Sequence, residues 1–145
     1  MKKSKRLSVL IKIEKAKERD EAFKLSEHQK ILKENIDKLS ELEAYLAEYR
    51  EKYMKLTHHG AEADKIRHSY AFISQLNSAI SQQMNTIRNL EFASDRYRQN
   101  WLEAKQRTDI LEKAVSKLRD EESRDNLKRE QLQADELAHF KRRSD

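Results

Sequence analysis

Apolar residues recur with a seven-residue repeat through the first half of the chain. Leu25, Leu32, Leu39, Leu46 and Tyr53 form one row, and His28, Asn35, Leu42, Tyr49 and Leu56 form a second. Alternating steps of three and four place both rows on one side of an α-helix, as in a coiled coil. We therefore predict a helix over residues 5–56 whose seam, formed by the two rows, faces a partner helix.

Two features modify this first seam. Toward the N-terminus we expect its register to shift, so that Ile13, Ala16 and Phe23 carry the apolar stripe. His28 and Asn35 are polar members of the seam, and such residues weaken a coiled coil while helping to fix its register.

The second half of the chain repeats the pattern. Its first row consists of Ile73, Ile80, Ile87, Ser94, Trp101, Thr108 and Val115. Its second row consists of Leu76, Gln83, Leu90, Tyr97, Ala104, Leu111 and Leu118. The next members are Glu122 and Asp125, so we expect this seam to end near Leu118, while the helical pattern continues to about residue 140.

The only natural break lies at residues 57–63, around the single glycine, Gly60. Glycine adopts left-handed backbone angles without penalty, and Asp64 can cap a following helix. Folding the chain about residue 60 pairs residues whose numbers add to about 121, so Leu118 meets the first few residues. We predict one all-α domain over residues 1–145, a long antiparallel two-helix coiled coil. Its second arm, about residues 64–140, ends in a helical overhang of about 25 residues. Pairing between two chains is the alternative.

Composition favours the same architecture. The 145 residues include one Gly, no Pro and no Cys, and 39% of them are charged. A β-sandwich, a barrel or a doubly wound α/β fold needs more turn residues, whereas long charged helices have this composition. No disulfide or cysteine zinc site is possible, and no apolar run approaches a membrane span. Because no signal peptide is evident, we expect the chain to be cytoplasmic.

The net charge of +5 is concentrated at the ends of the chain. Seven Lys and Arg residues against Glu14 give residues 1–17 a charge of +6, and Lys141, Arg142 and Arg143 make the other end basic. Such a run can bind nucleic acid or anionic lipid. Aromatic residues do not interleave with it, which argues against nucleic acid. The predicted coil uses the apolar stripe of the same segment, which argues against lipid.

Catalytic chemistry has no signature in the sequence. A glycine-rich phosphate loop and an H-E-x-x-H motif are both missing, and the carboxylates alternate with Lys and Arg at helical spacing. His58 and His59 are adjacent, so their side chains diverge and cannot converge on one metal ion. We interpret them as solvated residues of the turn. We predict no enzyme activity, no catalytic or metal-binding residues and no cofactor.

Two segments carry apolar residues that the predicted seam does not explain. Phe72 and Ala79 lie beside the seam and form a flanking stripe with Leu76, which suits an anchor for another protein. The alternative is that Phe72 folds over the coil near its turn. The overhang carries spaced apolar residues without a partner in the chain, and its alternative is a frayed tail. These residues are Leu127, Leu132, Leu137 and Phe140.

Several segments resemble the FliJ family of flagellar type III export proteins over about residues 66–140. They are Tyr70-Ala71-Phe72-Ile73-Ser74-Gln75-Leu76-Asn77-Ser78-Ala79-Ile80 with Gln82, Trp101-Leu102-Glu103-Ala104-Lys105 with Arg107, Lys128-Arg129-Glu130, Asp135-Glu136-Leu137-Ala138 and Arg142-Arg143. The first arm shares only charged heptads with the family.

The resemblance implies a non-enzymatic stalk, similar to the central stalk of rotary ATPases, at the cytoplasmic base of the flagellum. Both termini would enter the hexameric export ATPase FliI and promote its assembly. The middle segment would contact the cytoplasmic domain of the export-gate protein FlhA through Phe72, Leu76, Ala79 and Gln83. Unloaded export chaperones are further implied partners, nucleic acid is not, and membrane contact would be indirect, through the gate.

We assign the ATPase contact to the two ends of the chain. The residues are Lys2, Lys3, Lys5, Arg6, Leu127, Leu132, Leu137, Phe140, Arg142 and Arg143. Two alternatives remain: the corresponding stalk of a virulence secretion system, and a basic coiled-coil scaffold that binds nucleic acid or membrane.

Overall fold

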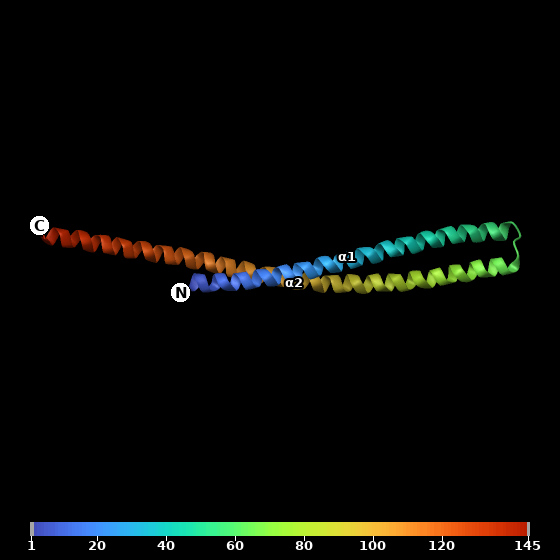
Figure 1. The fold of residues 1–145 in the computed structure, drawn as a ribbon, viewed down its shortest axis with the longest axis horizontal. Helices are drawn as coiled ribbons and strands as arrows, with labels where there is room; N and C mark the ends of the chain where they lie inside the picture. The colour runs from blue at the N-terminus through green and yellow to red at the C-terminus, as the bar shows by residue number, and fades with distance from the viewer. Residues whose placement is uncertain (1, 145) are drawn as a thin grey trace. The chain divides into compact units, whose positions relative to one another are not determined.

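The computed structural model describes residues 2–144, which form two helices and, within that range, no strand. Helix α1 is Lys3–His58 and helix α2 is Ala63–Ser144, joined by residues 59–62 (Figure 1). The predicted all-α helical hairpin is thus confirmed. The helices contribute to two compact units. We call Ala22–Asn100 the turn unit, and Met1–Glu21 with Trp101–Asp145 the terminal unit.

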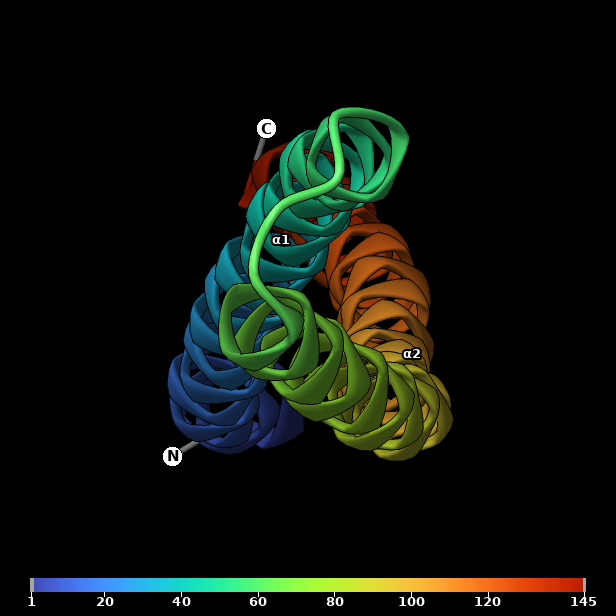
Figure 2. The same cartoon turned by 90° about the vertical axis from the view of Figure 1, so that its right-hand side faces the viewer.

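The connection between the helices is built around Gly60, which has a φ of 69°. The Ala61 N–H donates to the carbonyl of Leu56 at 3.0 Å, which closes the end of α1 in the way a left-handed glycine permits. Figure 2 shows the connection between α1 and α2 facing the viewer. A Cβ at this glycine would meet no atom within 4 Å. Glycine is therefore required here for its positive φ angle and not because a larger side chain would clash.

Asp64 does not occupy the capping position expected for it. Helix α2 begins one residue earlier, and the Ile66 N–H donates to the carbonyl of Glu62 at 3.2 Å. The Asp64 carboxylate instead pairs with Arg67 at 3.4 Å. An acid inside the first turn still interacts favourably with the helix dipole, so the residue stabilises this end without capping it.

The core of the turn unit consists of residues from the predicted rows. Leu46, Ile73 and Leu76 are its buried members. They are surrounded by Leu42, Tyr49, Tyr53 and Ile80. The predicted seam is therefore the real contact between the helices in this unit.

Polar seam residues in the turn unit are satisfied across the helix pair. Gln83 Nε2 donates to the backbone carbonyl of Asn35 at 2.9 Å and to its Oδ1 at 3.0 Å. His28 Nε2 lies 2.7 Å from the carbonyl of Leu90, and its ring stacks on Tyr97 with centroids 4.6 Å apart. A slip of one residue would leave these buried groups without partners, so they fix the register.

The predicted register shift near the N-terminus is wrong. Ile13 is 48% exposed, Phe23 is 64% exposed and Ala16 is also exposed. The original repeat instead continues without interruption to the start of α1. Its members here are buried or half-buried: Ser4, Leu7, Ile11, Glu14 and Glu18.

Small facing residues explain why glutamates are tolerated in this seam. In the terminal unit Ala104 is fully buried and Thr108 is 2% exposed. Their short side chains leave room for a glutamate stem, while its carboxylate reaches cations at the edge of the seam. The apolar seam of α2 reaches Leu118 as predicted, and the row continues one position further, to half-buried Glu122, which contacts Ser4.

We expect Leu46→Ala to destabilise the protein by about 2 kcal/mol, because it removes a buried side chain from the centre of the turn unit. Thermal unfolding followed by circular dichroism measures this change. Ile36→Ala is the matched control, since Ile36 is 45% exposed on the same helix, and should cost below about 0.5 kcal/mol. Equal effects of the two substitutions would contradict the assignment of the seam.

Candidate docking surfaces

Phe72 lies at the edge of the seam in the turn unit and remains 39% exposed. Its ring packs on Tyr49, with centroids 4.4 Å apart and planes tilted by 43°. Two shallow grooves of about 520 and 430 Å³ flank it, and both are also lined by His68. The side chain therefore folds over the coil, as the alternative interpretation proposed, and part of its ring remains exposed.

The four residues expected to form the gate contact do not form one exposed stripe. Leu76 and Gln83 are 8% and 7% exposed because they belong to the seam row of α2. Ala79 is half-buried, so Phe72 is the most accessible of the four. Leu76 and Gln83 can act on a partner only by positioning the residues beside them.

The N-terminus of α1 is held by a carboxylate from α2. Ser4 Oγ donates to Glu122 Oε2 at 2.7 Å, and the Ser4 N–H donates to Oε1 at 3.4 Å. The hydrogen bond from the Ser4 hydroxyl is the main cause of a lowered pKa of Glu122, to which the charges of Lys2 and Arg119 add. Since α1 has no acid in its own first turn, Glu122 supplies the negative charge that this helix end favours.

The basic residues at this end lie on the surface. Lys2, Lys3, Lys5 and Arg6 are all exposed. The Ser4 contact with Glu122 therefore places them beside the point where α2 loses its partner. This position agrees with the prediction that the start of the chain lies beside the end of the second seam.

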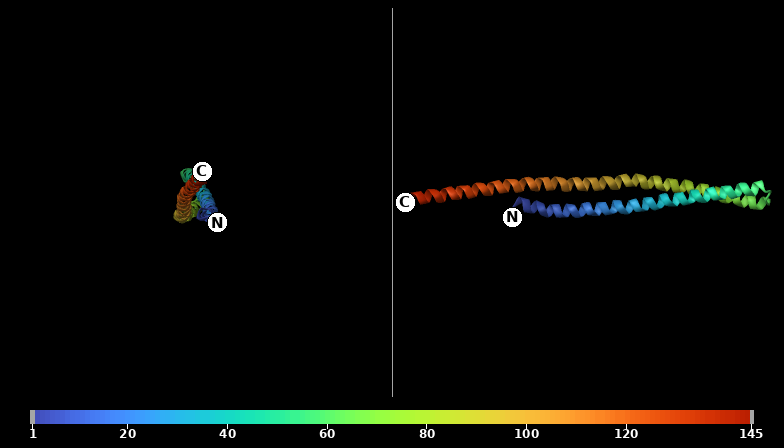
Figure 3. Two further views of the ribbon diagram at one scale, coloured as in Figure 1. Left: turned by 90° about the vertical axis from the view of Figure 1, so that its left-hand side faces the viewer. Right: turned by 90° about the horizontal axis from the view of Figure 1, so that it is seen from above.

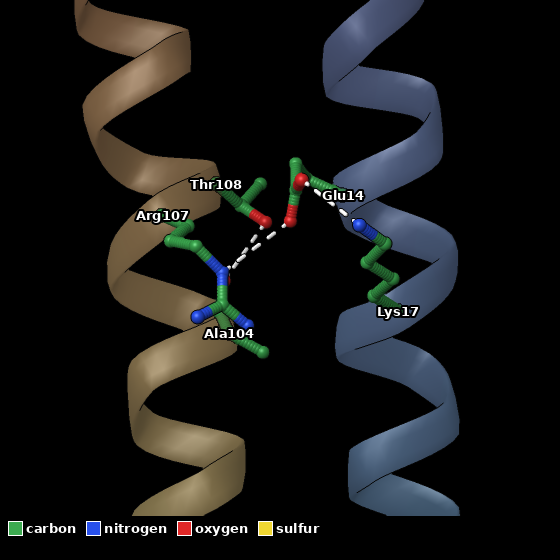
Figure 4. Close-up of polar contacts among 5 residues, drawn as sticks. All are labelled: Glu14, Lys17, Ala104, Arg107 and Thr108. Atoms are coloured by element: carbon green, nitrogen blue, oxygen red, sulfur yellow. Dashed lines mark hydrogen bonds and ion pairs between the residues drawn. The ribbon is translucent and has the colours of Figure 1, made fainter.

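Glu14 marks a polar section of the seam in the terminal unit (Figure 4). Its Oε1 lies 3.4 Å from Lys17 Nζ, and its Oε2 lies 3.5 Å from Arg107 Nε. Oε2 is buried but accepts no hydrogen bond. Thr108 Oγ1 donates to the carbonyl of Ala104 at 3.2 Å, which satisfies the hydroxyl within α2. The two ion pairs hold the charged Glu14 carboxylate at the edge of the helix pair. Glu14 therefore has a structural role.

The C-terminal part of α2 has no partner in the terminal unit (Figures 1 and 3). Every side chain from 123 to 144 is exposed. Leu127, Leu132 and Leu137 are spaced by five residues, and each step turns the direction by about 140° around the helix. Together with Phe140, which is 70% exposed, they surround the helix rather than forming one stripe.

The two basic ends of the chain are not brought together. Arg142 and Arg143 lie about 20 residues beyond Glu122 in α2, which corresponds to about 30 Å along the helix. The N-terminal cations therefore lie at the base of the overhang, and the C-terminal cations lie at its end.

One surface was missed in the sequence. Val9, Leu10 and Ile13 are 49%, 46% and 48% exposed in the terminal unit. The heptad repeat itself could have revealed this surface. When the repeat is continued from Leu25 toward the N-terminus without a shift, these three residues fall outside the seam.

Two further searches concern chemistry and membranes. Across residues 2–144, no three His, Cys, Asp or Glu side chains gather as a metal site would require. In the same range no helix is both long and apolar enough to cross a bilayer. His58 and His59 are exposed next to the turn, as expected, with ring centroids 6.0 Å apart.

Comparison with known proteins gives one match. The family model described as the flagellar FliJ protein matches residues 2–144, nearly the whole chain. Among curated proteins and solved structures, none matches this chain.

We expect Glu122→Ala to loosen the first turns of α1, because the Ser4 amide and hydroxyl lose their acceptor. Amide exchange at residues 4–8 should accelerate by roughly five-fold, while exchange in the turn unit stays unchanged. Glu121→Ala, at the exposed neighbouring position, is the control. Unchanged exchange at residues 4–8 would show that Glu122 does not hold this end.

The same contact predicts a dependence on pH. The pKa of Glu122 is lowered in the folded protein, so the contact stabilises the helix end above the ordinary carboxyl pKa. This stabilisation is lost as the pH falls through the lowered value. Carboxyl titration by NMR should show the pKa of Glu122 rising in Ser4→Ala, and an unchanged value would contradict the assigned cause.

Proposed function

Because the chain belongs to the flagellar FliJ family, a family of flagellar export-related proteins, we propose that it is a non-enzymatic stalk linking the export ATPase to the export gate. The observation that carries the proposal is the overhang of α2, a helix without a partner whose apolar side chains point in several directions. A groove binds one face of a helix, whereas a ring surrounds it. The overhang therefore suits the pore of a hexameric ring.

Charge at both ends of the overhang supports the ring contact. Lys2, Lys3, Lys5 and Arg6 lie at its base, and Arg142 and Arg143 lie at its end. Cations spread along the axis steer the helix toward a pore lined by acidic residues and raise the association rate. The exposed apolar residues Leu127, Leu132, Leu137 and Phe140 then supply the buried contact.

The gate contact is proposed for the surface around Phe72. Its ring is fixed against Tyr49, so little side-chain entropy is lost on binding. Ala79 lies one heptad further along α2, and the seam residues Leu76 and Gln83 hold the helix beneath this surface. We place the protein at the cytoplasmic side of the flagellar base, in contact with the gate protein FlhA.

We expect Phe72→Ala to weaken binding to the gate's cytoplasmic domain by about 2 kcal/mol, roughly 30-fold in affinity, because it removes the accessible aromatic anchor. Calorimetric titration of the two proteins measures this. Phe92→Ala is the matched control, since Phe92 is 82% exposed on the same helix and should leave binding unchanged. A large loss of helicity in Phe72→Ala would instead identify Phe72 as a core residue.

We expect a chain truncated after Arg124 to lose stimulation of the export ATPase, because the overhang is removed. The cut leaves the Ser4 contact with Glu122 intact, so the helix pair and its gate contact should persist. The ATPase rate measured against added protein checks this. Phe72→Ala is the reciprocal control, with stimulation retained and gate binding lost. Equal stimulation by the truncated and full chains would move the ring contact to the paired helices.

A further inference from the structure

The first part of α1 has a second apolar face, opposite its seam. Leu7, Ile11 and Glu14 take the seam positions in the terminal unit. At about 100° per residue, Val9 and Ile13 point to the far side of the helix from α2. Both are nearly half exposed, which agrees with this placement. Exposed Ala16 continues the stripe, and exposed Leu10 lies outside it, between Arg6 and the seam.

Cations border this outward stripe. Lys5 and Lys12 lie along one edge, and Arg6 lies along the other; all three are exposed. The only acid in residues 2–17 is Glu14, which lies in the seam with a side chain 18% exposed. The outward face is therefore apolar and positive, with no negative charge of its own over these residues.

We propose that this outward face of α1, over residues 5–16, binds the surface of a bilayer that contains anionic lipids. An apolar stripe bordered on both sides by Lys and Arg is the pattern of a helix that lies in the interface, with its apolar side chains among the acyl chains. The long stems of Lys and Arg let their charges reach the headgroups while the stripe is inserted. The sequence predicted that the coiled coil would bury this apolar stripe. The structure contradicts that prediction, because Val9 and Ile13 remain exposed.

The length of the stripe favours a bilayer over another helix as the occupant. Asp20 is the next residue after Ala16 on the outward face of the helix. Its charge ends the apolar stripe, which therefore covers only about three turns. A coiled-coil partner needs apolar positions sustained over several heptads. Shallow insertion into lipid needs only a few apolar side chains combined with charge attraction.

The proposal does not rest on the ring contact, because it depends on Val9 and Ile13, which that contact does not use. Neither residue belongs to the seam, so changing them leaves the helix pair intact. Failure of one proposal is therefore visible without failure of the other. Circular dichroism of each variant checks that helicity is unchanged.

The test is flotation of the full chain with vesicles of an equal mixture of phosphatidylglycerol and phosphatidylcholine. We expect binding at low salt that is at least about ten-fold stronger than to phosphatidylcholine alone and that weakens as salt is added. Val9→Gln combined with Ile13→Gln should lower binding about five-fold or more, because insertion is lost. Lys5→Glu combined with Lys12→Glu should abolish it.

Matched controls lie on α2 in the same unit. Ile110→Gln changes an apolar side chain that is 66% exposed, and Lys113→Glu combined with Lys117→Glu reverses two exposed charges one helical turn apart. Both control variants should bind vesicles as the unchanged chain does. A loss of binding in the controls equal to that in the α1 variants would show that general surface charge or hydrophobicity is responsible, and the proposal would be wrong.

Two other outcomes would also overturn it. If the Val9 and Ile13 variant binds anionic vesicles normally, the face does not insert and only bare charge attraction is present. If the chain ignores anionic vesicles and this variant instead loses affinity for the export ATPase, the outward face is a protein-docking surface. Normal vesicle binding by the chain truncated after Arg124 would support the bilayer proposal independently of the ring.

Discussion

A single stripe of contact between α1 and α2 supports every other feature of this molecule. A two-helix pair has no enclosed interior, and within residues 2–144 no large side chain is fully buried. The seam buries aliphatic residues such as Leu46 and Ile73 alongside polar ones such as His28, Gln83 and Thr108. Apolar burial holds the helices together, and hydrogen bonds such as Gln83 to Asn35 decide which residues face each other.

A stripe leaves most of each helix uncovered, and this is what makes the protein suited to docking. Phe72 rests on Tyr49 beside the seam, the overhang begins beside the N-terminus of α1, and Val9 and Ile13 lie on the side of α1 away from α2. Each surface lies on a continuous helix. Function in such a protein resides in residues outside the seam, whereas residues inside it set their positions.

Much of the fold could be predicted because a coiled coil requires apolar residues at a regular seven-residue repeat, which is visible in the sequence. The heptad rows and the turn at Gly60 follow from spacing and from one residue type. The predicted register shift at Ile13 and Phe23 is wrong because polar residues such as Ser4 and Glu14 occupy the seam in this segment, whereas these apolar side chains are exposed. Glu14 and Glu18 occupy seam positions that only small partners such as Ala104 permit, and that compatibility involves residues about 90 positions away in the chain.

The candidate surfaces were less predictable than the fold, for a related reason. Leu76 belongs both to a seam row and to the flanking stripe that contains Phe72. Periodicity alone cannot decide whether its side chain is buried in the seam or exposed with the stripe, and the structure shows that it is buried. The contact of Ser4 with Glu122 depends on the pairing register to within one residue, whereas the turn alone fixes only an approximate alignment.

The two proposed contacts at the N-terminus compete for the same charges. Lys5 and Arg6 lie at the base of the overhang, where a ring would reach them, and also border the outward stripe of α1. A cation held against a headgroup cannot at the same time pair with an acidic ring loop, so a bilayer and a ring would each weaken the other's hold on this end. The apolar residues of the overhang, from Leu127 to Phe140, lie roughly 8 to 27 Å beyond Glu122 along the helix, out of this competition. The chain thereby separates a contact that depends on charge and responds to salt from one that depends on apolar burial.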